Sequence, residues 1–283
     1  TATKIYEAST SSWTDRSRVG NYSGANPTRF TMFGNFILST NRSEVIQACP
    51  SGSNFADIAG APAAAIIDSC AGFVMALNTS DGTYGDRPDG WWCSGLYDHT
   101  TWAPASSTQA ANGRLVDTPG ALTAGRALGR AFVAYKADSL YLGRSVGLPI
   151  IWAWQPIPGT VGCASPEAVA SVNNAHYFVG AQNIYVFDGA TVQPIGDKIA
   201  RWFFSQLNNT YKNNIRGIAD ASKDLIYWYY PTASSTLDAC IVYNYVSGEW
   251  GRISGSIQAP VDFISGQITW DNLGTLGSTW DDL

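Results

Sequence analysis

The sequence predicts an all-β protein, and within that class a β-propeller built of four-stranded antiparallel blades. Hairpin signals recur along the chain, residues typical of strands are abundant, and only one segment has a helical period. Of the 283 residues, 13% are aromatic, with 11 Trp and 14 Tyr, which favours strands over helical bundles. A hydrophobic content of 45% is sufficient for a packed core.

Apolar runs on either side of short turn segments predict five hairpins. The clearest lies in "AHYFVGAQNIYVFDG", with its loop at 180–183. Two others are expected to turn at 136–138 and 246–248. The run "DLIYWYYP" (224–231) is continuously apolar, so we expect a strand that is buried on both faces. The predicted hairpins span residues 34–48, 64–77, 129–143, 175–188 and 225–253.

The spacing of these hairpins is close to that of propeller blades, which are about 40 to 50 residues long. Blades arranged around an axis also protect strand edges, which an aromatic-rich sheet protein must keep from aggregating. No strict repeat signature of a known propeller class occurs, so a pair of stacked β-sandwiches remains the alternative. We assign residues 1–265 to the propeller domain.

One short helix is expected near 197–208, as a decoration on the sheets. Ile199, Trp202, Phe203 and Leu207 follow the spacing of one helical face. Asp197 comes just before this run, so we expect its side chain to cap the helix.

The last residues, 266–283, contain the near-copies TWDNL (269–273) and TWDDL (279–283). Both are rich in Asp and Asn and are separated by Gly, which makes them poor strand material. We therefore expect an exit segment, in which successive turns lead out of the last blade towards a C-terminal part that is missing here.

The charge of the chain argues against simple electrostatic attraction to nucleic acid or anionic lipid. The net charge is −5, and only 14% of residues are charged. The stretch 114–144 is the exception, because basic residues exceed acidic ones there. Its arginines are candidates for sparse contact with DNA phosphates without sequence preference, the alternative being a solvated strand face. These candidates are Arg114, Arg126, Arg130 and Arg144.

The five cysteines are widely spaced and form no C-x-x-C pair, which argues against a disulfide framework and a zinc site. We interpret them as reduced core residues of a protein that folds in a cytoplasm. The longest apolar stretch is interrupted by Pro62 and Asp68, so no membrane segment is predicted. No cofactor or metal motif is present, and none is expected to be bound.

The sequence gives little support for an enzyme. His99 and His176 are the only histidines, and no G-x-S-x-G nucleophile motif occurs, so no catalytic residue is assigned. The best enzymatic candidate is the segment 85–102, where carboxylates lie among tryptophans as in sugar sites. In the alternative interpretation the Asp residues cap turns and the Trp residues fill gaps between blades. The residues concerned are Asp86, Asp89, Asp98, Trp91, Trp92 and Trp102.

Several stretches together resemble the tail nozzle and tail-hub proteins of short-tailed bacteriophages, structural proteins that help to stabilise packaged DNA. The most recognisable runs from "YLGRSVGLPIIWAWQPIPG" to "DKIARWFF". Each motif alone is degenerate, but they follow one another in family order and cover essentially the whole chain. The resemblance is carried by residues 1–41, 55–79, 91–104, 141–204, 220–232, 240–250 and 269–283.

The resemblance implies a structural virion protein without catalytic residues. Copies of the chain would form a ring, in six copies, that extends the portal channel and contacts portal or adaptor proteins and other tail proteins. Double-stranded DNA would pass through this ring without sequence-specific binding. The protein would be located in the virion, within the phage tail, after assembly in the host cytoplasm. A carbohydrate-binding or glycoside-hydrolysing propeller at the host surface is the alternative function.

Overall fold

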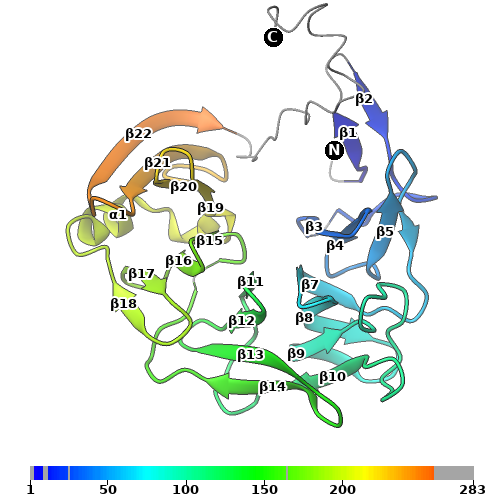
Figure 1. Ribbon diagram of the computed structural model, residues 1–283. Coiled ribbons are helices and arrows are strands. Elements are labelled where there is room, and N and C mark those ends of the chain that lie inside the picture. Colours follow the sequence, from blue (N-terminus) through cyan, green and yellow to red (C-terminus); the bar gives the residue numbers. More distant parts are fainter. Residues whose placement is uncertain (1–2, 9–11, 25, 164, 258–283) are drawn as a thin grey trace, which may run out of the picture.

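The computed structural model describes residues 3–8, 12–24, 26–163 and 165–257. Five four-stranded antiparallel sheets stand around a common axis, which makes the molecule a β-propeller (Figure 1). The predicted all-β class and the four-stranded antiparallel blades are therefore confirmed. The predicted exit segment 266–283 lies outside the described residues.

Each blade is one stretch of chain, in which every strand pairs with the next one along the sequence. Blade 1 contains β3 (Arg29–Phe33), β4 (Phe36–Thr40), β5 (Gln47–Pro50) and β6 (Ala56–Asp57), and blade 2 contains β7 (Ala63–Cys70), β8 (Phe73–Asp81), β9 (Gly85–Cys93) and β10 (Ala111–Arg114). Blade 3 contains β11 (Ala124–Leu128), β12 (Ala131–Tyr135), β13 (Leu140–Gly147) and β14 (Ile151–Pro156). Blade 4 contains β15 (Val169–Val172), β16 (Ala175–Val179), β17 (Ile184–Phe187) and β18 (Val192–Pro194), and blade 5 contains β19 (Arg216–Asp220), β20 (Leu225–Tyr230), β21 (Leu237–Asn244) and β22 (Trp250–Ile257).

The first strand of each blade is the inner one, because the first strands of successive blades contact one another around the axis. The chain then runs outward through the blade and crosses to the inner strand of the next (Figure 1). The five predicted hairpins correspond to paired strands within these blades, with the predicted turns at 136–138, 180–183 and 246–248.

The core lies between the blades and is strongly aromatic. Trp91 and Trp92 are consecutive on β9, so their rings point to opposite faces and enter different gaps. Each such ring removes a large apolar area from water, and full burial of a large apolar side chain contributes about 1.5 to 3 kcal/mol. The gap between blades 1 and 2 contains Leu38, Val74 and Trp92, that between blades 2 and 3 contains Phe73, Trp91 and Phe132, and those from blade 3 to blade 5 contain Tyr135, Phe178 and Trp228.

The expected helix is present as α1 (Ala200–Gln206), and it is followed by the 3-10 helix η1 (Asn209–Asn214). Ile199, Phe203 and Leu207 are buried against the sheets, as their spacing predicts. The predicted cap is wrong. The N-cap position is Ile199, which makes no side-chain cap, and Asp197 lies too early and accepts a hydrogen bond from Asn183 instead.

The sequence predicts that strand β20 is buried on both faces. In the structure only one face is fully buried. Ile226, Trp228 and Tyr230 are fully buried towards blade 4, whereas the alternate residues are half-buried. The reason is positional. Blade 5 is the last described blade, so its second face has no described sheet packed against it (Figure 1).

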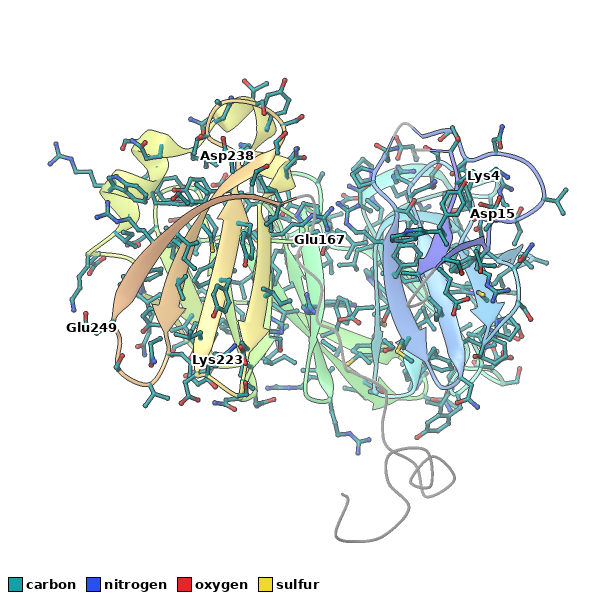
Figure 2. The ribbon with its side chains drawn as sticks, turned by 90° about the horizontal axis from the view of Figure 1, so that it is seen from above. Lys4, Asp15, Glu167, Lys223, Asp238 and Glu249 are labelled. Carbon is teal, nitrogen blue, oxygen red and sulfur yellow. The ribbon has the colours of Figure 1, made fainter. Side chains whose placement is uncertain are left out.

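A short hairpin that the sequence patterns do not predict precedes blade 1. It consists of β1 (Tyr6–Ala8) paired with β2 (Trp13–Asp15), both exposed. An ion pair of 3.2 Å between Lys4 and Asp15 lies at its base, and Figure 2 shows both on the side of blade 1. The backbone N–H of Phe55 donates to the carbonyl of Arg16, which ties the hairpin to blade 1.

Candidate functional site at the propeller axis

Charged side chains of all five blades gather where the inner strands meet. Each blade contributes one, from its inner strand or, in blade 4, from a position two residues before it. Figure 2 shows Glu167 between the two halves of the ring. We call the group the axial cluster. It consists of Arg29, Asp68, Arg126, Glu167 and Arg216.

An ion pair crosses the axis between blades that are not neighbours. The Arg29 Nε atom lies 2.9 Å from Oε1 of Glu167, which joins blade 1 to blade 4. Nη1 of Arg29 also donates to the carbonyl of Ala65 in blade 2. Burial lowers the pKa of Arg29, and the carboxylate of Glu167 opposes this effect. The guanidinium therefore keeps its charge and binds three blades together.

Asp68 connects the inner strands of three consecutive blades. Its Oδ1 accepts a hydrogen bond of 3.0 Å from the Thr31 hydroxyl in blade 1, and its Oδ2 accepts one of 3.0 Å from the backbone N–H of Ala127 in blade 3. Hydrogen bonds to a charged acceptor are stronger than neutral ones. The carboxylate thus holds the register of the three inner strands at the axis.

Arg126 and Arg216 line a cavity of about 260 Å³ at the axis, together with Glu167 and Ser171. Arg126 donates to the carbonyl of Val169 in blade 4 at 3.2 Å. No ion pair of Arg216 is present within the part of the chain that the structure describes. Because the single carboxylate here is already paired with Arg29, the cavity has an excess of positive charge. Such a site suits a small anion with several oxygen atoms, such as phosphate or a carboxylate.

The four arginines predicted from the sequence are not brought together. Arg126 alone belongs to the axial cluster. Arg114 lies on the outer strand β10 and forms two hydrogen bonds of 2.8 Å with the carboxylate of Asp89. Arg130, in the turn between β11 and β12, and Arg144, on β13, are exposed elsewhere. The sequence reasoning missed the other axial residues because its only signal was local charge density, and they are dispersed along the chain.

The tryptophans of the carbohydrate alternative are core residues. Trp91, Trp92 and Trp102 are 6%, 5% and 1% exposed, and Nε1 of Trp102 donates to the carbonyl of His99. None of the three rings therefore has a face available for stacking on a sugar. This arrangement agrees with the interpretation that they fill the gaps between blades.

The carboxylates of the same alternative have structural partners. Asp86 forms an ion pair with Arg42, and Asp89 with Arg114. Asp98 accepts hydrogen bonds from Thr100 and Thr101, which lower its pKa to about 2. The three groups are therefore engaged in ion pairs and a turn, and they do not form a pair across a cleft.

His176 is fully buried, between blades 3 and 4. Its Nε2–H donates to the carbonyl of Ala127, and its Nδ1 accepts from the hydroxyl of Tyr135 at 2.8 Å. This arrangement satisfies the neutral ring, and desolvation lowers the pKa to about 4. The residue is a structural link between blades 3 and 4.

All five cysteines are buried in the blades or between them. Desolvation raises the pKa of Cys70, Cys93 and Cys240 to about 12, as expected for unreactive core thiols. The described residues contain no group of His, Cys, Asp or Glu able to hold a metal ion. In the same part of the chain, the helices are all too short or too polar to span a membrane.

No protein-family model matches the chain, and no curated protein matches its sequence. Among solved structures, the chain is similar to BamB from Moraxella catarrhalis, with a TM-score of 0.45 and 10% sequence identity. The similarity covers 84% of this chain and 64% of that one, so the chain spans less than two thirds of that protein.

Proposed function

We propose that the protein is a structural subunit of a bacteriophage tail. In this proposal, copies of it form a nozzle or hub ring that extends the portal channel, retains packaged DNA and lets it pass during ejection. The order of motifs along the chain supports the proposal, and so does the propeller fold, whose rigid blades suit a scaffold rather than a moving part. The proposal concerns a protein with no catalytic role.

The observation that carries the proposal is an apolar tip on the longest hairpin of blade 3. Val146, Leu148 and Ile150 follow one another at alternate positions around the turn between β13 and β14, and they are 53%, 55% and 63% exposed. Isolated apolar residues on a surface need no explanation, but three on one projecting tip favour a protein contact. A second copy of the chain is the partner that a homo-oligomeric ring supplies.

The axial cluster restricts where DNA could pass in such a ring. The Arg29–Glu167 ion pair occupies the axis of the propeller itself, with 2.9 Å between its charged atoms. The proposed DNA channel therefore lies between subunits and not through a single propeller. In that arrangement Arg126, at the propeller axis, does not line the DNA channel, and the exposed Arg114, Arg130 and Arg144 remain the candidates for contact with DNA phosphates.

Electron microscopy of the intact phage particle tests the proposal directly. We expect the chain in a symmetric ring on the tail axis, with the β13–β14 tip against an adjacent copy. Finding the protein outside the particle, or as a single copy within it, would contradict the proposal.

A matched pair of variants tests the contact surface. The double substitution Leu148→Asp and Ile150→Asp should convert the purified ring to monomers, because two carboxylates in an apolar contact cannot be solvated. Val246→Asp, at an exposed apolar position in the turn before β22, should leave the ring intact. Native mass spectrometry measures both, and an unchanged oligomer in the double variant would exclude the tip as the interface.

A further inference from the structure

The hairpin β1–β2 stands where the outer half of a further blade would lie. In every complete blade the chain leaves from the outer strand and enters the inner strand of the next. Because β2 leads into β3, the inner strand of blade 1, β2 takes the outer position of the preceding blade and β1 the position beside it. Figure 1 agrees, since the hairpin stands between blades 5 and 1 with β1 nearer the axis than β2. No described strand fills the two inner positions.

The face of blade 1 that such strands would cover is exposed. Phe30 and Met32 on β3 are 50% and 67% exposed, and Ile37, the cross-strand partner of Met32, is 40% exposed. Further out on the same face, Cys49 pairs with Ile37 and is only 5% exposed, because the hairpin covers it. The boundary between covered and uncovered surface therefore falls between the outer and inner strands of the blade.

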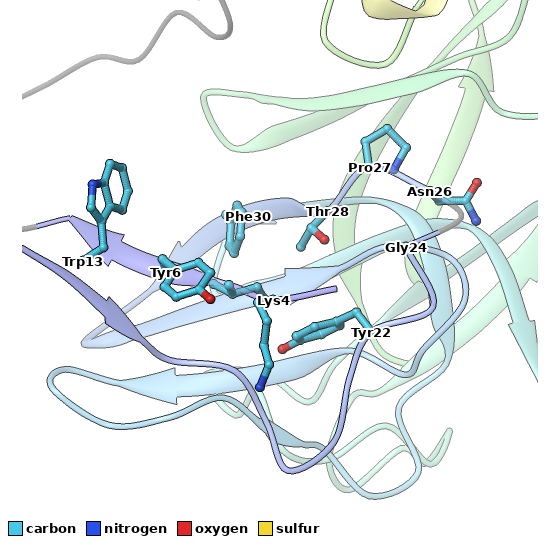
Figure 3. Close-up of a pocket in the computed structure, with 10 residues that line it drawn as sticks. Lys4, Tyr6, Trp13, Tyr22, Gly24, Asn26, Pro27, Thr28 and Phe30 are labelled. Carbon is cyan, nitrogen blue, oxygen red and sulfur yellow. The ribbon is translucent and has the colours of Figure 1, made fainter. Parts of the chain in front are cut away.

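A groove of about 930 Å³ marks the same place. It lies between the hairpin and β3, and Figure 3 shows Tyr6, Trp13 and Phe30 around it. Trp13 is 73% exposed, although a tryptophan is rarely so open to water in a complete core. The groove therefore has the position and the apolar lining of an unfilled blade interior.

Blade 5 presents a second apolar face towards the same interval. Tyr227 and Tyr229 stack with ring centroids 6.3 Å apart, on the side of β20 opposite to the buried Trp228. Ile253 on β22 is 48% exposed, and its cross-strand partner is Cys240. Two apolar faces thus border the interval, as two neighbours border every complete blade.

We propose that residues 258–270 fill this interval and supply the two inner strands of the sixth blade. The chain leaves the outer strand of blade 5 at Ile257, so by the rule that all blades follow, the next residues enter an inner strand. The segments 261–264 (VDFI) and 267–270 (QITW) contain β-branched and aromatic residues and are separated by Ser265-Gly266, a turn dipeptide.

The pairing of such a hairpin gives it one apolar face. A two-residue turn at 265–266 places Phe263 opposite Ile268, and Val261 opposite Trp270. Because the positions alternate, all four side chains lie on the same side, and the more polar residues lie on the other. This apolar face complements the exposed Phe30, Met32 and Ile37 of blade 1.

In this proposal the propeller extends to residue 270, beyond the boundary at residue 265 that the sequence patterns suggest. The sequence patterns alone suggested that the chain leaves the propeller from 266 onward. The open inner edge of β1 is the reason for moving this boundary, since an unpaired edge with apolar faces on both sides binds a strand readily.

Amide hydrogen exchange on the full chain provides the first test. Ile268→Asp should lower the protection of the β1 and β3 amides by about tenfold, as expected when 1 to 2 kcal/mol of local stability is lost. Trp280→Asp, in the repeat outside the proposed blade, is the matched control and should change nothing. Unchanged protection in the Ile268 variant would overturn the proposal.

A disulfide cross-link distinguishes which segment or protein fills the interval, and this test does not depend on a destabilised variant. The pair Met32→Cys and Phe263→Cys should form a disulfide within one chain under mild oxidation, seen on a non-reducing gel as a faster monomer band. A disulfide-linked dimer would mean that a second copy fills the interval. Absence of any cross-link would mean that another protein or no segment fills it, and either result would refute the assignment.

Discussion

At the scale of single residues, His176 links the stability of the propeller to pH. Its ring is neutral in the folded protein because both nitrogens already have hydrogen-bond partners and the side chain is fully buried. The pKa of His176 is about 4 in the folded protein, whereas the ordinary value of 6.5 applies to the unfolded chain. The unfolded chain therefore binds more protons between these two pH values. Stability is therefore fully present above pH 6.5 and falls as the pH decreases towards 4.

We expect the free energy of unfolding to decrease by about 2 kcal/mol between pH 7 and pH 5 through this residue alone. Urea unfolding at the two pH values measures the change. In the His176→Gln variant, which does not titrate, this part of the decrease should disappear, although the variant is less stable throughout. Equal pH dependence in both proteins would show that His176 is not the responsible group.

The cavity at the axis leads to a second prediction about individual residues. If Arg126 and Arg216 bind an anion, inorganic phosphate should raise the melting temperature of the wild-type protein, since a ligand that binds only the folded state stabilises it. Arg216→Gln should reduce this increase, while Arg144→Gln, at an exposed position on β13, should retain it. Differential scanning fluorimetry with phosphate or chloride provides the comparison. The same increase in all three proteins would contradict a specific axial site.

At the scale of elements, the close approach of two loops makes Gly162 sensitive to substitution. A Cβ atom there would lie 2.0 Å from the carbonyl oxygen of Lys136, which is backbone of the β12–β13 turn and cannot rotate away. We expect Gly162→Ala to destabilise the protein by about 1 to 3 kcal/mol, the usual cost of overpacking. Gly82→Ala, where the added atom meets nothing within 4 Å, is the control. Chemical denaturation of the two variants should separate them clearly.

The hairpins and the helix cap illustrate which elements can be predicted from the sequence and which cannot. The hairpins of blades 3 to 5 were predicted because their apolar runs alternate around distinct turn residues. The hairpin β1–β2 was missed because its three-residue strands are exposed and carry no alternation. The cap by Asp197 was wrong because sequence spacing does not reveal that Asn183 offers it another partner.

The candidate site was less predictable than the fold, for a geometrical reason. Arg126 was selected for the charge of its neighbours in sequence, whereas its partners at the axis come from other blades. Arg29 and Glu167 are far apart in the chain and meet because Arg29 lies on the inner strand of blade 1 and Glu167 lies just before the inner strand of blade 4. Their proximity follows from the number and order of the blades, which the sequence patterns did not provide.

At the scale of the whole molecule, the net charge of −5 predicts weak contact with DNA. We expect unrelated duplexes to bind with the same low affinity, which decreases further with salt, because only phosphates would be contacted. Fluorescence anisotropy with several duplexes at two ionic strengths measures this. A preference for one sequence would contradict a passive channel wall.

The Arg29–Glu167 ion pair also has a mechanical consequence. A chain of blades joined only to their neighbours can widen as an arc when its two ends are pulled apart. A tie between blades 1 and 4 acts like a spoke, because it joins blades that are otherwise connected through blades 2 and 3 and so resists widening of the arc. The stiffness of the ring would then depend on this ion pair as well as on the closure of the interval between blades 1 and 5. A force-extension measurement that pulls blades 1 and 5 apart should register the rupture of the spoke as a separate event before the sheets unfold.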